Sequence, residues 1–339
     1  MDIITQAALG GAIAQGGFKE HRRRGVAFGA FCGIVPDLDS LLSIGDRWQG
    51  LVVHRGSSHS LLVLPLLAIP LGWLGWRIFG RRGEVKSWIQ LAFWALITHP
   101  LLDVCTTYGT QLFAPFSAQR FALDTVAIID PLYSLPIFAA ICVGFRASAW
   151  PERASRWAKN ALIWGLTYLV IQMMWTHANE RTFRQRLAHI GFEAQHVRTP
   201  VPILWPVIRH GVAHDKDGRI AISKQVLWAS ERDPILVIES ADNPRIRAVL
   251  ETPRGRIWSW FADGMVGVEL SDDGTIVLSD HRYGLYADKT FSFFKATLKP
   301  NEPIENLEML RPSQSRKGLD IGHEWSTGWR LITGQSDDN

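Results

Sequence analysis

The sequence has few cysteines and lacks the motifs of the common hydrolase families. Its three cysteines, Cys32, Cys105 and Cys142, are widely spaced and include no C-x-x-C pair. This excludes a disulfide framework and a cysteine-rich metal site, and we expect all three to be small buried side chains. Because G-x-S-x-G and H-E-x-x-H are also missing, the sequence gives no support to serine-hydrolase or zincin chemistry.

We expect no secretory signal peptide, since the sequence starts M-D-I-I-T-Q, which is acidic where a signal would be basic. We therefore expect the first apolar segments to direct insertion themselves. No internal repeat and no low-complexity run stands out. The basic excess is small, with Lys+Arg 36 against Asp+Glu 32. The arginine clusters lie between apolar runs, where loop charge sets membrane orientation, so we expect no nucleic-acid partner.

The composition changes near Trp175, from long apolar runs to a mixed pattern with charges throughout. We predict an α-helical polytopic membrane domain over residues 1–176, followed by a small β-rich (α+β) soluble domain over 177–334. The last residues, 335–339, are predicted to be a disordered tail. Short strands with frequent turns are expected at Arg219–Ser223, Ile235–Ser240, Arg256–Phe261, Val266–Leu270 and Thr275–Ser279.

The apolar segments and the basic patches between them predict a membrane topology. The segments are Asp2–Gln15, Val26–Val35, Leu61–Phe79, Trp88–Val104, Val126–Phe145 and Ala161–Trp175. The first two are shorter than the roughly 20 residues of a full span, and their small residues favour a closely packed pair. The basic patches are Lys19–Arg24, Arg77–Lys86 and Arg146–Lys159. Placing them in the cytoplasm puts the loops Pro36–Ser60 and Cys105–Thr125 and the C-terminal domain outside. We predict a multi-pass protein of the bacterial inner membrane, in contact with the bilayer.

Several ionisable residues fall at the ends of the apolar segments, all at the predicted external face. They are Asp37 and Asp39 in P-D-L-D, His54, Arg55 and His59 in H-R-G-S-S-H, and the pair His99 and Asp103. Such residues are costly beside lipid and usually mark a site. Simpler roles are helix capping for the aspartates, a hydrogen-bonded pair for His99 and Asp103, and an interfacial position for Arg55.

Carboxylates and imidazoles together suit a divalent transition ion, with zinc or manganese as the leading candidates. His99 and Asp103 share one helix face at i, i+4 and can bind one ion together. A bound ion points to hydrolysis, because it generates hydroxide at neutral pH. Arg55 is suited to grip a phosphate or carboxylate, and Asp37, Asp39 or Asp103 to act as general base or orienting group.

The loop that follows Asp103 adds polar residues at the same boundary: Tyr108, Gln111, Ser117 and Arg120. They are candidates for holding a substrate head group, or else belong to an interfacial aromatic belt with structural turns. Asp130 lies inside an apolar run and needs a partner, for which Arg120, Arg55 or the metal are candidates.

Taken in order, these motifs resemble a known family. The set D-I-I-T-Q-A-A-L-G, P-D-L-D, H-R-G-S-S-H-S, H-P-L-L-D, T-Y-G-T-Q-L-F-A-P-F-S and D-P-L-Y is similar to the membrane-bound metal-dependent hydrolases of the bacterial inner membrane (the DUF457 group). The resemblance covers most of the first 135 residues. In the predicted β-rich domain, S-D-H-R-Y-G at Ser279–Gly284 resembles a D-x-R-x-G motif of the family's soluble part. It implies a metal site formed by Asp37, Asp39, His54, His59, His99 and Asp103. Gln6 stands where some members have His.

The leading hypothesis is a metal-dependent hydrolase with its site at the external membrane face, acting on a phosphoester or lipid-linked substrate. Its catalytic candidates are Asp37, Asp39 and Arg55. The alternative is a non-catalytic membrane scaffold or regulatory protein, with a structural metal or polar network and a partner-binding external domain. An ion transporter is disfavoured, because the ionisable residues gather at one face and do not cross the midplane. The oligomeric state is left open.

Overall fold

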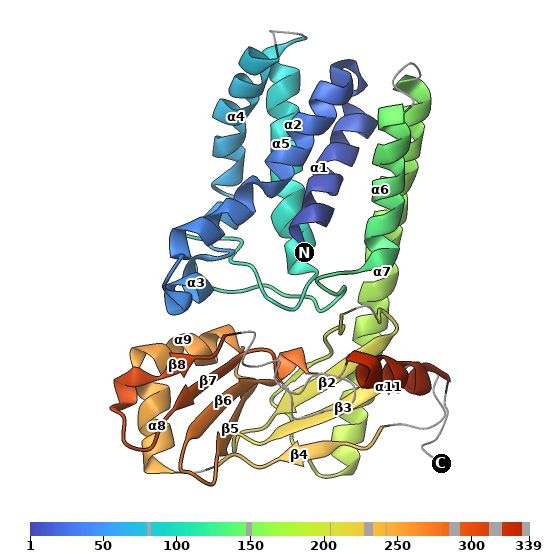
Figure 1. Ribbon diagram of the computed structural model, residues 1–339. Helices are drawn as coiled ribbons and strands as arrows, with labels where there is room; N and C mark the ends of the chain where they lie inside the picture. Colours follow the sequence, from blue (N-terminus) through green and yellow to red (C-terminus); the bar gives the residue numbers. More distant parts are fainter. Residues whose placement is uncertain are drawn as a thin grey trace. The chain divides into compact units, whose positions relative to one another are not determined.

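The computed structural model describes residues 1–79, 83–146, 151–203, 205–226, 233–241, 243–284, 292–311 and 321–333. The chain divides into two compact units, Met1–Met173 and Met174–Asn339. The first is helical and the second carries two small antiparallel sheets (Figure 1). The predicted tail, 335–339, lies outside the described residues.

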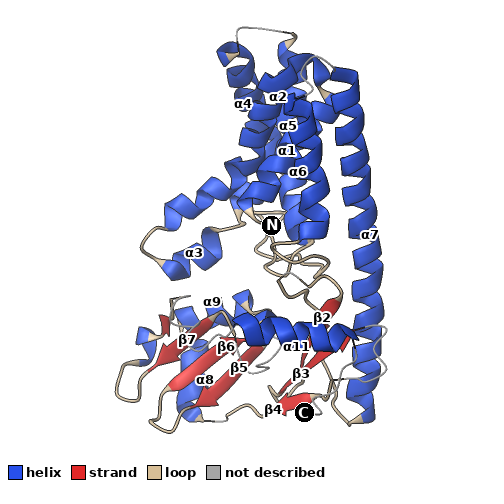
Figure 2. Ribbon diagram, turned by 45° about the vertical axis from the view of Figure 1, so that its right-hand side comes forward, coloured by secondary structure: helices blue, strands red, loops and turns tan. Residues whose placement is uncertain are grey.

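Each apolar segment predicted in the first half overlaps a helix, although Val126–Phe145 begins before α6 does. The helices are α1 (Ile3–Gly17), α2 (Arg22–Ile34), α4 (Leu64–Ile78), α5 (Val85–Val104), α6 (Pro131–Arg146) and α7 (Pro151–His189). Helix α1 packs against α2, α5 and α6, and α5 packs against α4, so these helices lie side by side (Figure 2). Short polar elements join them: the 3-10 segments η1 (Lys19–His21), η2 (Val35–Ser43) and η3 (Ser57–His59), and helix α3 (Arg47–Val53).

The apolar faces of these helices meet in two clusters of buried side chains. One includes Leu9, Tyr133 and Ile137, and the other includes Trp88 and Leu91. Cys32 belongs to the second cluster and is buried, Cys105 is half-buried, and Cys142 is exposed. The expectation that all three cysteines are buried is therefore wrong for Cys142, which lies on the outer side of α6.

Among the described helices, no single one is long and apolar enough to cross a membrane. One bent pair, Arg47–His59 with Leu64–Ile78, passes the same test together, with an angle of 70° between its two parts. The helical character of the first half is confirmed, whereas the assignment of individual spans stays a prediction.

Close packing of α1 on α2 depends on glycines that face each other. A Cβ at Gly29 would lie 2.4 Å from the carbonyl oxygen of Gly10, and one at Gly10 would lie 2.1 Å from that of Gly29. Backbone atoms cannot move aside as a flexible side chain can. The two helices therefore approach as closely as the absence of side chains at these positions allows.

Replacing Gly29 by Ala is expected to lower the free energy of unfolding by about 1–3 kcal/mol, because the added methyl group overpacks a backbone contact. Denaturant titration of the purified protein measures the change. Gly17→Ala is the matched control, since a Cβ there meets nothing within 4 Å. Equal stability of the two variants would contradict the close contact.

The second unit contains two antiparallel sheets whose strands follow each other in sequence order. The first has β1 (His196–Arg198), β2 (Ile208–His214), β3 (Ile220–Val226) and β4 (Leu236–Ile238), and the second has β5 (Val266–Leu270), β6 (Ile276–Asp280), β7 (Lys295–Leu298) and β8 (Glu308–Met309). The described part of this unit also contains the helices α8 (Pro244–Glu251), α9 (Pro253–Phe261) and α11 (Ile321–Thr333) and the 3-10 segments η4 (His281–Tyr283) and η5 (Ile304–Asn306).

The prediction of a β-rich second half is confirmed, with one local error. The hairpin of β5 and β6 pairs Val266 with Asp280 and Leu270 with Ile276, as the S-D-D-G-T turn indicates. The stretch Arg256–Phe261, predicted as a strand, lies in α9. Thr252 caps that helix, and Trp258 and Phe261 are buried at helical spacing, i and i+3, which the sequence pattern did not distinguish from a short strand.

Candidate metal centre

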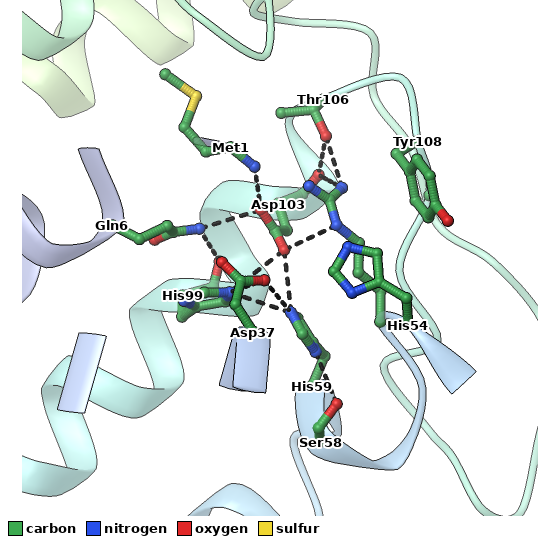
Figure 3. Close-up of polar contacts among 12 residues, drawn as sticks. Met1, Gln6, Asp37, His54, Ser58, His59, His99, Asp103, Thr106 and Tyr108 are labelled. Atoms are coloured by element: carbon green, nitrogen blue, oxygen red, sulfur yellow. Dashed lines mark hydrogen bonds and ion pairs between the residues drawn. The ribbon is translucent and has the colours of Figure 1, made fainter. Parts of the chain in front are cut away.

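Three segments far apart in the sequence bring two histidines and two aspartates together (Figure 3). Asp37 comes from η2, which follows α2. His59 comes from η3, which leads into α4, and His99 and Asp103 lie one turn apart near the end of α5. One ligand atom from each of the four side chains lies within 4.8 Å of the other three. We call these four residues the inner cluster.

Both imidazoles of the inner cluster turn Nε2 toward its centre. The two Nε2 atoms lie 3.1 Å apart. Nδ1 of His99 lies 2.6 Å from the carbonyl oxygen of Gly33, which can only accept, so Nδ1 carries the proton and Nε2 of the neutral ring keeps its lone pair. Nδ1 of His59 lies 3.0 Å from Ser58 Oγ. Hydrogen bonds on the outer nitrogen orient metal-binding histidines in this way.

The carboxylate oxygens complete a set of distances that fits one ion. Asp37 Oδ1 lies 3.4 Å from each Nε2 atom, and Asp103 Oδ2 lies 3.3 Å from that of His59 and 3.5 Å from that of His99. Ligands held about 2.0–2.2 Å from a tetrahedral ion are themselves roughly 3.3–3.6 Å apart. The inner cluster therefore has the spacing of a transition-metal site.

Burial supports the same interpretation. The side chains of His59, His99 and Asp103 are fully buried, and only Asp37 is partly exposed, at 14%. Asp103 Oδ2 makes no hydrogen bond with a described residue, although it faces both imidazoles and forms an ion pair with Arg55 Nε. Arg55 and the Met1 amino group already pair with Asp103, whose buried carboxylate needs positive charge nearby. A divalent cation would add positive charge between Asp103 and Asp37, at the point that both imidazoles face.

Asp39 and His54, also predicted as ligands, lie one step outside the inner cluster. Asp39 Oδ1 lies 2.8 Å from His54 Nδ1, and its Oδ2 lies 3.4 Å from His59 Nδ1. Asp39 Oδ2 also accepts hydrogen bonds from Ser58 Oγ at 2.5 Å and from the Arg55 amide at 3.0 Å. Asp39 thus holds the outer nitrogen of a ligand-type histidine, and His54 holds Asp39.

Electrostatics keeps Asp37 and Asp39 ionised. Burial opposes the charge of each carboxylate, but the imidazoles of His59 and His99 that face Asp37 outweigh burial and hold the pKa of Asp37 below its ordinary value. For Asp39, hydrogen bonds from His54, His59 and Ser58 likewise overcome burial and lower its pKa. Both groups are therefore carboxylates at neutral pH, as metal ligation or orientation of a ligand requires.

Arg55 places a buried guanidinium beside the inner cluster. Its Nε lies 3.0 Å from Asp103 Oδ2, and an Nη atom donates to Thr106 Oγ1 at 2.9 Å. The guanidinium also lies over the ring of Tyr108, 4.9 Å from its centroid. Arg55 has a φ of +61°, in the left-handed region that is uncommon for a residue with a side chain. The backbone at this position is thus held in a costly conformation next to the cluster.

The family model of the YdjM inner membrane protein matches residues 1–179, more than half of the 339-residue chain and all of the inner cluster. The chain belongs to the YdjM family. This confirms the family resemblance inferred from the motifs. Membership in the YdjM family supports a location at the bacterial inner membrane.

One relative of this YdjM family member is the Bacillus subtilis (strain 168) protein named "Uncharacterized protein YfhP". It is 24% identical over 114 residues, which are 34% of this chain and 35% of the Bacillus protein. The similarity thus spans about a third of that relative. No solved structure matches the chain.

Two further groups at the site of this YdjM family member were not predicted as contacts. Gln6 Nε2 donates to Asp103 Oδ1 at 3.0 Å and to the His99 carbonyl at 3.2 Å, and the amino group of Met1 also contacts Asp103 Oδ1. The family resemblance marked Gln6 only as a departure from the pattern, and its contacts were not predicted. The contact between His99 and the Gly33 carbonyl oxygen could not be predicted from the sequence, because every residue has a backbone carbonyl group.

The remaining predicted polar residues divide between two places. Tyr108 stands between two guanidinium groups, because Arg120 also lies 4.9 Å from its ring centroid. Gln111 and Ser117 line a pocket of about 330 Å³ that also touches Asp39. Asp130 caps α6 and accepts a hydrogen bond from Tyr168 at 2.8 Å, so it lies outside the inner cluster and serves the helix.

Proposed function

We propose that this protein is a metal-dependent hydrolase of the inner membrane, with the inner cluster as its metal site. The observation that carries the proposal is a buried convergence of two Nε2 atoms, 3.1 Å apart, and two carboxylate oxygens that each lie 3.3–3.5 Å from both Nε2 atoms. Asp37, His59, His99 and Asp103 would hold the ion. When bound, a divalent ion would polarise a substrate oxygen and lower the pKa of bound water toward neutrality.

The chain's own groups have distinct parts in this proposal. Asp37 is the one member of the inner cluster with an exposed side-chain fraction, so its side is where substrate and water approach. Asp39 acts as a positioning residue, because it reaches the inner cluster only through His59. Arg55 supplies a fixed positive charge beside the ion, where negative charge on a phosphoryl group would develop.

The number of coordination positions that the protein leaves open on a bound ion distinguishes the hydrolase proposal from the scaffold or regulatory alternative. Four protein ligands fill a tetrahedral zinc site, and a closed site of this kind is typically structural. A six-coordinate ion such as manganese would keep two positions for water and substrate. The scaffold or regulatory alternative therefore predicts tight zinc without turnover, whereas the hydrolase predicts turnover that depends on the bound ion.

The proposed topology rests on the different groups that lie at the two ends of α1. Gln6, near its start, contacts the inner cluster, whereas the basic residues Lys19 to Arg24 follow its end. A 15-residue helix is about 22 Å long, so metal site and basic patch are well separated. With the basic patch in the cytoplasm, the inner cluster faces outward at head-group depth. The multi-pass arrangement and an external second unit belong to this proposal.

A phosphoester or lipid-linked substrate fits this location, because the site would lie where lipid head groups are and carries the cation Arg55. The test is hydrolysis of a panel of phosphoester lipids by the full chain, purified in detergent and loaded with manganese or zinc. We expect metal-dependent turnover that falls at least 100-fold in Asp37→Asn. His189→Gln, an exposed histidine of α7, is the matched control and should keep full turnover.

Two results would count against the hydrolase proposal. Tight, stoichiometric metal in a folded protein, with no turnover on the panel by wild type and an unchanged fold in Asp37→Asn, would favour the structural site of a scaffold protein. Absence of bound divalent ion in both wild type and His59→Ala would remove the basis of either metal-site proposal.

A further inference from the structure

A groove of about 410 Å³ opens between α1, α5 and α7. Its walls are mainly apolar, formed by Ile13, Phe18, Trp94 and Leu162. The groove lies toward the end of α1 that carries Gly16 and Gly17, whereas the inner cluster lies at the other end, near Gln6. It is therefore a separate feature, and neither the metal site nor the proposed hydrolase activity uses it.

The polar residues of the groove are few, and the charged one is basic. Thr98 lies on the α5 side, and Lys159 lies on the α7 side. A Cβ built on Gly16 would lie 3.5 Å from Cγ of Lys159, so the lysine stem runs along α1 beside the groove. The side chain of Lys159 is exposed, which leaves its ammonium group accessible.

The charge around Lys159 is positive overall. One carboxylate lies nearby, that of Glu152, which forms an ion pair with Lys19. The hydrogen bond from Lys19 and the charges of Lys19, Lys159 and Arg156 together lower the pKa of Glu152. Arg156 and Lys159 lie three residues apart on α7 and therefore share one helix face, and the carboxylate of Glu152 already has a partner in Lys19.

We propose that this groove binds one acyl chain of an anionic phospholipid, with the lipid phosphate at Lys159 and Arg156. An apolar channel that ends at basic side chains matches an amphiphile with one apolar tail and one negative head. Basic pockets between helices of membrane proteins bind anionic lipids by the same charge complementarity. Phospholipids are available to bind in the groove, because the chain belongs to an inner-membrane family.

The proposal is tested by native mass spectrometry of the full chain in mixed micelles. The micelles contain equal amounts of phosphatidylglycerol and phosphatidylcholine with the same acyl chains. We expect wild type to retain one phosphatidylglycerol per chain, in about fivefold preference over phosphatidylcholine for each basic residue engaged. Equal retention of the two lipids, or a dimer of the chain without bound lipid, would overturn the proposal.

Two variants separate the head-group and tail contacts. Lys159→Gln should lower phosphatidylglycerol retention about fivefold and leave phosphatidylcholine unchanged. Gly17→Leu should lower retention of both lipids, because Gly17 lines the groove and a Cβ there meets nothing within 4 Å, so the new side chain fits without displacing others. Lys86→Gln, an exposed basic residue at the start of α5, is the matched control and should behave as wild type. Lys159→Gln retention equal to that of Lys86→Gln would refute the head-group contact.

Discussion

Replacing His99 by Gln is expected to lower the affinity for a divalent ion by more than about 100-fold. His99 Nε2 is one of two imidazole nitrogens that face the centre of the inner cluster, 3.1 Å from the other. Loss of a hydrogen-bonding partner behind a ligand typically costs 10–100-fold in metal affinity, and loss of the ligand itself costs more. Competition titration against a chelator of known affinity, with the full chain in detergent, measures the change.

Asp39→Asn makes this experiment sharper, because Asp39 lies behind His59 and outside the inner cluster. We expect it to lower metal affinity about 10–100-fold, less than His99→Gln and more than the exposed control His189→Gln. This order distinguishes a ligand from a residue that positions a ligand. An Asp39→Asn loss as large as that of His99→Gln would mean that Asp39 binds the ion directly. No loss in His99→Gln would contradict the site.

Replacing Arg55 by Met should lower the free energy of unfolding of the metal-free protein by about 3–5 kcal/mol. Arg55 Nε lies 3.0 Å from Asp103 Oδ2, and the two side chains are 3% and 0% exposed. Removing the guanidinium leaves a buried carboxylate without its principal cation, and the desolvation penalty is then no longer offset. Denaturant unfolding in detergent, followed by circular dichroism, provides the measurement.

A matched control for this variant is Arg184→Met, which removes an exposed i, i+4 pair with Glu180 on α7. Its cost should be about 0.5 kcal/mol, as is typical of solvent-exposed pairs. Saturating metal should reduce the cost of Arg55→Met, because an ion at the inner cluster would supply positive charge to the same carboxylate oxygen. A loss in Arg55→Met no larger than in Arg184→Met, with or without metal, would show that Asp103 does not depend on Arg55 for its charge.

The helical half was predictable because its apolar segments are longer than typical strands. The ends of α2, α4 and α5 fall within a few residues of the predicted segments, since polar and basic residues bound each one. The short strands were harder, because a few alternating residues fit a strand and a buried helix face equally well. Arg256–Phe261 shows this ambiguity: the capping Thr252 and the spacing of Trp258 and Phe261 decide for a helix.

The inner cluster was predictable only as part of a larger set. Residue type, the placement of charge at segment ends and the family resemblance together selected Asp37, Asp39, His54, His59, His99 and Asp103. Which of the six converge depends on the path of the chain through η2 and η3, and that path has no signature in spacing. The left-handed backbone conformation of Arg55, with a φ of +61°, is likewise not indicated by the sequence.

The central claim is that one divalent ion binds between Asp37, His59, His99 and Asp103. Crystals of the full chain grown with manganese or zinc, with anomalous diffraction recorded at the absorption edge of that metal, test it most directly. We predict one anomalous peak within about 2.0–2.3 Å of two Nε2 atoms and two carboxylate oxygens of these residues, with Asp39 and His54 outside the coordination sphere. A peak coordinated by Asp39 and His54, or no peak between the two imidazoles at saturating metal, would contradict the account.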